Sequence, residues 1–297
     1  MDEVEQLISV KFQNRPPACA ALIELWQEFK SSGLADNIFV PEITSGDDGK
    51  FWSRVWEMNL HRELVRAGHQ PASADCGPDF GIMLSGRRMW FEAVCPSPMQ
   101  IDENWLQRPP GKVWSFPHSE ITLRLTSAIR DKSKKFDDYR TKGWVGSDDA
   151  YVICVCSGRL LAGDPLLAND IDNFGVSGAP LIGEAVLPIG PWAVSVKEGG
   201  HMGESFRSSR TNILKHNGEP IPTTMFLDPA FAGVSAVLCS ASLHPTRDWQ
   251  PLIVHNPLAR APLPTGLFPG ALEYMAEVDG EWLNVKRAGD GGRAENG

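Results

Sequence analysis

Two acidic residues, Asp79 and Glu92, are spaced to act together. Apolar runs from Phe80 to Leu84 and from Met89 to Cys95 flank Ser85-Gly86, a pattern that predicts a β-hairpin with a two-residue turn. In that register Asp79 faces Glu92, with Cβ atoms roughly 4.5–5.5 Å apart. Two carboxylates this close repel each other unless positive charge lies between them, and their oxygens suit Mg²⁺ or Mn²⁺. The hairpin therefore predicts a divalent metal site.

Glu92 lies in the middle of an apolar strand. Trp90 and Val94 share its face, and Phe91 and Ala93 share the other, so both faces of the strand are largely apolar. This is typical of an inner strand in a covered sheet. Burying an unpaired carboxylate there costs several kcal/mol, so Glu92 needs a partner. A buried ion pair is the alternative to a metal ion.

Two helices are predicted to bring further charges to this strand. The first spans about residues 51–67, and Glu57 borders its apolar stripe. The second spans about residues 117–139. Lys132 lies inside its apolar stripe and Lys135 on the flank of that stripe. A lysine on a buried helix face needs a counter-charge, which acids in the adjacent sheet would supply.

The second helix is also basic, in contrast to the chain as a whole. Residues 119–142 contain seven Lys or Arg against four acids, whereas the whole protein has a net charge of −9. A buried strand follows at residues 150–157, and a strand, helix and strand joined in this way predict parallel pairing by a right-handed crossover. An amphipathic helix is predicted nearer the N-terminus, at residues 17–32.

The second half of the chain is rich in Gly and Pro. Short strands are predicted at residues 194–196, 224–227 and 234–240, and an extended segment at residues 255–264. The segment from 205 to 218 contains Arg207, Arg210 and Lys215 and no acid. These three cations are predicted to contact nucleic-acid phosphates, the alternative being solvated loop charges.

Composition limits the function classes. The 297 residues, 42% hydrophobic with ten Trp, can bury a substantial core, and the net charge of −9 argues against a generic nucleic-acid coat protein. Six scattered Cys without a CxxC pair indicate a reducing compartment and no zinc ribbon. The acidic N-terminus and the absence of a long apolar run predict a soluble cytoplasmic protein with no membrane partner. No nucleophile elbow, P-loop or dinucleotide fingerprint is present.

The order of these features resembles the PD-(D/E)XK, or restriction-endonuclease-like, nuclease superfamily. The resemblance rests on Glu57 in the first helix, Pro78-Asp79 at the start of a strand and Glu92-Ala93-Val94 in the next strand. It implies an α/β fold with an αβββαβ core, whose first strand would be a weak one at residues 69–75, and a mixed central sheet flanked by helices. It implies phosphodiester hydrolysis with Mg²⁺ or Mn²⁺ held by Asp79, Glu92, the Ala93 carbonyl and Glu57.

The chain departs from the family pattern at one position. The family's second motif ends in Lys, and this chain has Val94 there. In some families of this group the lysine migrates to the neighbouring helix, where Lys132 lies, so Glu57, Asp79, Glu92 and Lys132 form the predicted catalytic set. Lys135 is predicted to contact nucleic acid, with DNA favoured over RNA. The alternatives are a degenerate nuclease fold that binds nucleic acid or protein without cutting, and a hydrolase or scaffold unrelated to nucleic acid.

The predicted domain organisation has four parts. Residues 1–50 form a helical N-terminal extension and residues 51–157 the nuclease-like core. Residues 158–286 form a β-containing accessory region packed on the core, and residues 287–297 a disordered tail. The family resemblance covers the core well, and the C-terminal half looks like the accessory region of bacterial relatives. The sequence leaves the oligomeric state open.

Overall fold

The computed structural model describes the whole chain except residues 74–76, 109–110, 112, 176, 280–281 and 290–297. The chain is an α/β protein whose main sheet is mixed and has the strand order β1-β2-β3-β8-β9-β10-β11. These strands are β1 Phe80–Leu84, β2 Arg87–Val94, β3 Ala150–Cys156, β8 Ala236–Ser240, β9 Leu252–His255, β10 Leu272–Asp279 and β11 Trp282–Arg287.

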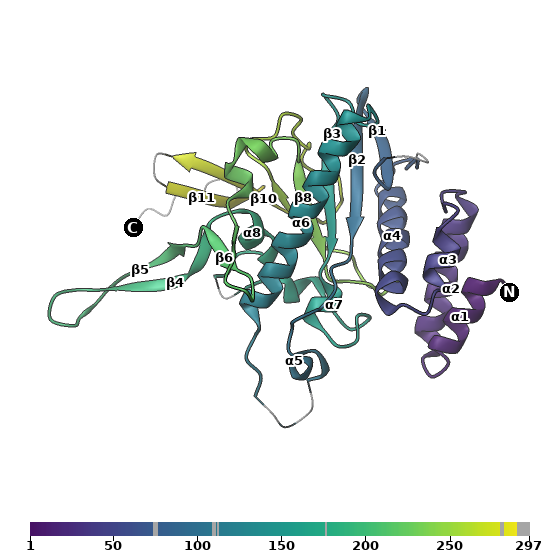
Figure 1. Cartoon of the computed structure of the whole chain (residues 1–297), viewed down its shortest axis with the longest axis horizontal. Helices are drawn as coiled ribbons and strands as arrows, with labels where there is room; N and C mark the ends of the chain where they lie inside the picture. The colour runs from purple at the N-terminus through teal and green to yellow at the C-terminus, as the bar shows by residue number, and fades with distance from the viewer. Residues whose placement is uncertain (74–76, 109–110, 112, 176, 280–281, 290–297) are drawn as a thin grey trace.

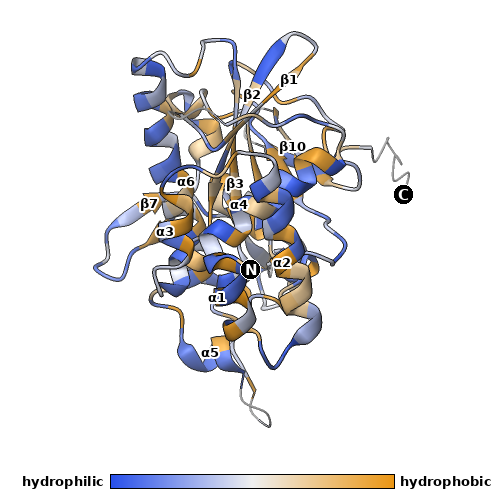
Figure 2. Cartoon of the chain, turned by 90° about the vertical axis from the view of Figure 1, so that its right-hand side faces the viewer, coloured by the Kyte–Doolittle hydropathy of each residue, from blue (hydrophilic) through white to orange (hydrophobic). Residues whose placement is uncertain are grey.

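Helices lie on both faces of this sheet (Figure 1). The helices are α1 Glu3–Lys11, α2 Pro16–Ser31, α3 Phe39–Ile43, α4 Asp48–Arg66, α5 Glu103–Gln107, α6 His118–Thr141, α7 Gly158–Leu161 and α8 Leu181–Val186. Polar and apolar colours alternate along α2, α4 and α6 in Figure 2, as expected for helices with one buried face.

The predicted hairpin is confirmed with its register. Leu84 pairs with Arg87 and Phe80 with Phe91, in antiparallel orientation. Ser85 and Gly86 both have positive φ, 51° and 79°, as in the type I′ turn that suits a two-residue hairpin loop. The turn therefore fixes which residues of β1 and β2 lie opposite each other.

Helices α4 and α6 cover opposite faces of β2. Alternate residues of β2 point to opposite sides, so Phe91 packs in one core with Trp56 of α4, and Trp90 packs in the other with Ile129 of α6. The predicted parallel pairing of β2 with β3 is confirmed, with Glu92 beside Ile153. Helix α6 is the crossover between these two strands, which places it directly over the face that carries Glu92.

Several predicted elements differ in the structure. The weak strand at residues 69–75 is reduced to one isolated bridge, Ala72 to Gly81, although residues 74 and 75 lie outside the described part. The predicted strand at 224–227 is wrong, because Met225–Leu227 forms a 3-10 helix. A short apolar run fits either element, and proline before and after this run limits its length.

The C-terminal part extends the main sheet. Strands β8 to β11 continue directly from β3, and Arg287 ends β11, so the predicted disordered tail is wrong at that residue. Residues 290–297 lie outside the described part. Two further hairpins lie outside the main sheet, formed by β4 Ile189–Val196 with β5 Met202–Ser209 and by β6 Asn212–Leu214 with β7 Pro220–Pro222. Among the described residues, none of the helices is long and apolar enough to cross a membrane.

The contact of α4 with the sheet yields a stability prediction. The buried Trp56 indole donates a hydrogen bond to the Cys154 carbonyl of β3, at 2.9 Å. We expect Trp56→Phe to lower the free energy of unfolding by about 1–3 kcal/mol, because the hydrogen bond and part of the packing are lost. Urea denaturation measures this. The exposed Val65 of the same helix is the control, and Val65→Ala should stay within about 0.5 kcal/mol of the wild type. Equal losses in both variants would contradict this description of the core.

Candidate metal and catalytic site

The Glu92 carboxylate is buried beneath α6, with a fractional exposure of 1%. Lys132 donates a hydrogen bond to Glu92 Oε1. Lys135 contacts the same oxygen at 3.2 Å, and the Tyr139 hydroxyl donates to Oε2, also at 3.2 Å. Because residues three, four and seven apart share one face of a helix, a single face of α6 presents all three donors to β2. The predicted lysine of the helix is thus in direct contact with the predicted acid of the strand.

The charges of this cluster are strongly coupled. Burial alone would lower the pKa of Lys132, but the carboxylates of Glu92 and Asp79 outweigh burial and raise that pKa. Burial, followed by the charge of Glu92, raises the pKa of Tyr139 well above its usual value. Lys132 is therefore held as a cation and Tyr139 as a neutral donor.

Asp79 lies just before β1, at the position that continues the hairpin register toward Glu92. The ladder ends at Phe80, and Asp79 Oδ2 instead accepts a hydrogen bond from the backbone N–H of Ala93, at 2.6 Å. Burial, followed by the charge of Glu92, raises the pKa of Asp79 to about 6, although Lys132 and the Ala93 hydrogen bond oppose the shift. The two acids thus interact as predicted, with repulsion that the nearby cations only partly offset.

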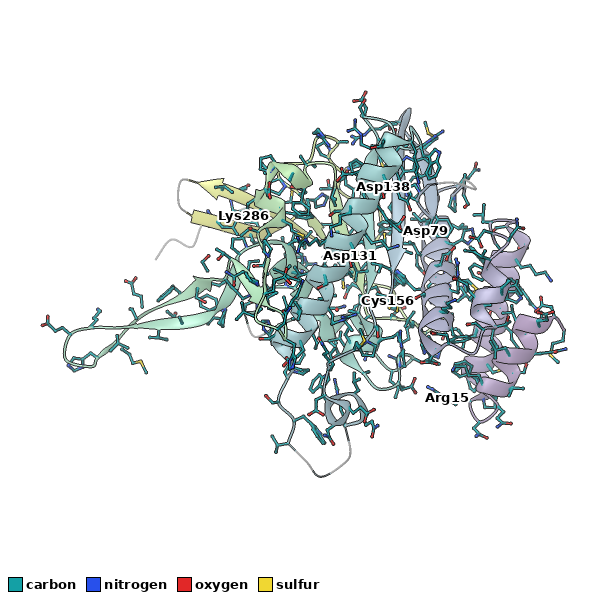
Figure 3. The ribbon with its side chains drawn as sticks, in the orientation of Figure 1. Arg15, Asp79, Asp131, Asp138, Cys156 and Lys286 are labelled. Carbon is teal, nitrogen blue, oxygen red and sulfur yellow. The ribbon has the colours of Figure 1, made fainter. Side chains whose placement is uncertain are left out.

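Glu57 adds a third carboxylate from α4. Its side chain is 13% exposed and forms an ion pair with Arg54 at 2.6 Å, one turn earlier in the helix. Burial, followed by the charge of Asp79, raises the pKa of Glu57 to about 8, against the effect of Arg54. Figure 3 labels Asp79 close to α4, in agreement with this interaction. Asp79 therefore interacts electrostatically with both Glu57 and Glu92.

The donor set suits an oxygen-preferring divalent cation in chemical type and in charge. Mg²⁺ is often held by one or two carboxylates with water completing its shell, and burial together with a neighbouring acid raises the pKa values of the Asp79 and Glu57 carboxyls. Within the described residues, however, no group of three or more His, Cys, Asp or Glu side chains is arranged to hold a metal ion. The metal-ligand roles of Asp79, Glu92, Glu57 and the Ala93 carbonyl stay predictions.

The three cations predicted to contact phosphates, Arg207, Arg210 and Lys215, contact other protein groups in the structure. Arg210 pairs with the buried Glu184 at 3.1 Å, and Lys215 pairs with Glu219 at 2.8 Å. Arg207 donates to the Ser177 carbonyl and lies over the ring of Trp192. In the described part of the chain, none of the three forms a hydrogen bond or an ion pair with Glu92. Their contact with phosphates stays a prediction.

Two residues of the cluster were missed in the sequence. Tyr139 lies on the buried face of α6, and its hydroxyl donates a hydrogen bond to Glu92. The signal was its spacing, seven residues after Lys132 and so on the same helix face. Arg54 was not singled out, although its position three residues before Glu57 is an ion-pair spacing on a helix.

Comparisons of the chain with models of known protein families, with curated proteins and with solved structures found no match.

The raised pKa of Asp79 predicts how stability changes with pH. The unfolded chain releases this proton near pH 4, whereas the folded protein holds it to about pH 6. The free energy of unfolding therefore falls as the pH rises from about 4 to about 6, and the full loss is present above that range. We expect Asp79→Asn, which keeps an oxygen for the Ala93 N–H, to raise the free energy of unfolding by about 1–3 kcal/mol near pH 8 and by much less near pH 4.

Urea denaturation in the presence of EDTA measures this effect at both pH values. Asp131→Asn is the matched control, because the Asp131 side chain is 77% exposed on α6. The control should change stability by less than about 0.5 kcal/mol at either pH. A destabilised Asp79→Asn variant near pH 8 would show that the negative charge of Asp79 is compensated in the folded protein.

Proposed function

We propose that the protein is a Mg²⁺- or Mn²⁺-dependent nuclease of the PD-(D/E)XK type. The observation that carries this proposal is the contact between Lys132 of α6 and Glu92 of β2, beside Asp79. The motif Glu92-Ala93-Val94 lacks its lysine, and Lys132 supplies an ammonium group to the same carboxylate from the neighbouring helix. The proposal includes a restriction-endonuclease-like core made of α4, β1, β2, α6 and β3, with the Ala72–Gly81 bridge at the place of the first strand.

Asp79 and Glu92 would hold the metal ion, with the Ala93 carbonyl and Glu57 as further ligands. When bound, the ion supplies Lewis-acid polarisation of the phosphate and a nucleophile at neutral pH. Lys132 would then exchange part of its contact with Glu92 for a water molecule or a phosphate oxygen, and so offset developing negative charge. Lys135, whose side chain is 52% exposed, is placed to contact the phosphate backbone from the solvent side.

The proposed substrate is nucleic acid, with DNA favoured over RNA. The net charge of −9 excludes binding through overall attraction of the protein to phosphate, so a local basic surface must bind the nucleic acid. Helix α6 carries six Lys or Arg against four acids, and Lys142 follows it directly; Lys132 and Lys135 already contact Glu92.

A second candidate function is a nuclease fold that binds nucleic acid or another protein without cutting. It is favoured by the hydrogen bonds of Glu92, because both of its carboxylate oxygens already accept from Lys132, Lys135 or Tyr139. A carboxylate satisfied in this way releases its partners only if the metal ion interacts with it more strongly.

Cleavage assays test the enzyme directly. We expect the wild type to cleave DNA with Mg²⁺ or Mn²⁺, and Lys132→Met to lose at least about 100-fold in rate, because one positioned donor to developing charge is removed. Lys134→Met is the matched control, since Lys134 lies on the same helix with a side chain that is 67% exposed. Its rate should stay within about threefold of the wild type.

Asp79→Ala is the control for a contaminating nuclease in the same assay. Equal cleavage by the wild type, Asp79→Ala and Lys132→Met would mean that another nuclease is present and would remove the support for the proposal. RNA of the same sequence, tested in parallel, decides between the two substrates.

Calorimetric titration with Mn²⁺ separates the two candidate functions. We expect the wild type to bind Mn²⁺ and Glu92→Gln to lose at least about tenfold in affinity, because a charged ligand is replaced by a neutral one. Asp131→Asn should bind as the wild type does. Mn²⁺ binding that Glu92→Gln weakens would count against the non-cutting candidate, and no binding at all would favour it and leave Glu92 as a structural partner of α6.

A further inference from the structure

The hairpin of β1 and β2 has an open surface on the same face as the candidate site. Alternate residues of a strand share a face, so Asp79, Gly81 and Met83 lie on one side of the hairpin. In its register Trp90 lies opposite Gly81, and Arg88 lies opposite Met83. Helix α6 covers this face at the candidate site, whereas Met83 and Arg88, near the turn, are exposed. The open surface therefore continues from the carboxylates toward the turn.

The Trp90 ring is fixed across the middle of this face. It lies so close to Gly81 that a Cβ at that position would come within 2.9 Å of a ring carbon, which the absence of a side chain permits. The indole N–H donates a hydrogen bond to Asp149 Oδ2 at 2.9 Å, and Trp90 is buried. Because the ring is held in this way, a side chain that packs on it is also held in place.

Arg88 packs on this ring, with its Cζ 5.3 Å from the ring centroid, as in a cation–π contact. Among the described residues, none accepts a hydrogen bond from the Arg88 guanidinium or forms an ion pair with it. Asp149 instead accepts from Trp90 and from the Gly146 N–H, through the same oxygen. The N–H donors of Arg88 are thus positioned by an aromatic ring and are available to an anion such as a phosphate.

A pocket of about 600 Å³ opens beside Arg88, around the outer edge of β1. Gly81, Met83, Arg88 and Trp90 line it from the hairpin, and residues 68–70, 72 and 73 line it from the segment that follows α4. None of the described residues that line it is acidic. One cation, a few polar groups and an apolar wall suit a ligand with an anionic group and a flat, partly apolar body, and the volume is that of a small-molecule site. A nucleotide has this chemistry.

We propose that this pocket binds a nucleotide of the strand that is cut, with Arg88 on its phosphate, an inference that rests on the proposed nuclease function. Arg88 lies four residues from Glu92 along β2, about 13 Å away at roughly 3.3 Å per residue. A stacked strand advances roughly 3.4 Å per nucleotide, so the bound phosphate lies about four nucleotides from the one at the metal site. The preferred substrate is therefore an oligonucleotide that spans this distance, in contrast to a small phosphodiester.

The salt dependence of DNA binding tests the Arg88 contact without requiring cleavage. Fluorescence anisotropy in EDTA measures the affinity for a labelled duplex of about 20 base pairs over a salt series. We expect Arg88→Gln to weaken binding about five- to tenfold at 0.1 M salt and to reduce the slope of log K against log salt by about 0.9, because one phosphate contact is lost. Arg88→Lys, which keeps the charge, should recover most of the slope.

Lys286→Gln is the matched control, because it removes the same charge at the opposite edge of the main sheet. Lys286 lies on β11 with a side chain that is 64% exposed, and Figure 3 shows it far from Asp79. Its slope should equal that of the wild type. Met83→Glu tests the pocket from the other strand and should weaken binding by placing an acid opposite Arg88, whereas Met83→Gln should bind as the wild type does.

Cleavage kinetics test the expected substrate length. With Mn²⁺, Arg88→Gln should raise KM for the duplex with little change in kcat, and should cleave a nitrophenyl phosphodiester as the wild type does, because that substrate does not reach Arg88.

Equal salt slopes for the wild type and Arg88→Gln overturn the inference, as does a wild type that does not bind the duplex. If the wild type cleaves DNA but its binding does not depend on Arg88, the proposed function stands and this inference fails. If binding depends on Arg88 but neither Mg²⁺ nor Mn²⁺ supports cleavage, the phosphate contact is supported and the proposed catalysis fails.

Discussion

The carboxylate of Glu92, buried in an inner strand, is the constraint on which the site depends. Leaving it unpaired there would cost several kcal/mol, so the fold must bring cations and donors to it. Helix α6 does this with Lys132, Lys135 and Tyr139, which fixes how the helix is rotated over β2. The crossover from β2 to β3 therefore joins two strands and also completes the electrostatic environment of one side chain.

The acids around Glu92 are not compensated equally. Glu92 accepts from three donors, whereas Asp79 accepts from the Ala93 N–H and interacts with the charge of Lys132, and Glu57 pairs with Arg54. Burial, followed by the charge of a neighbouring acid, raises the pKa of Asp79 to about 6 and that of Glu57 to about 8 despite these partners. Crowded carboxylates of this kind reduce stability near neutral pH, and groups with shifted pKa values in such clusters are typical of sites that bind a cation or move a proton. We interpret the imbalance as the reason why this cluster would accept a metal ion.

The sequence was sufficient for the parts of the fold that local pattern determines. The Ser85-Gly86 turn and the alternation of β2 predicted the hairpin register, and the helical spacing of Lys132 predicted its inward direction. Local pattern could not reveal that Arg210 pairs with Glu184, because that contact depends on how distant segments pack. The same limit explains the missed extension of the sheet by β8 to β11, whose pairing joins residues far apart in the chain.

We propose above that Asp79 and Glu92 share a divalent cation. Lys132 would give up part of its contact with Glu92 when the cation binds. Crystals grown with Mn²⁺ and measured for anomalous scattering test this most directly. We expect a Mn²⁺ peak between the carboxylates of Asp79 and Glu92, with Lys132 displaced from its contact with Glu92. A structure without a peak at these carboxylates, and with Lys132 still bonded to Glu92, would contradict it.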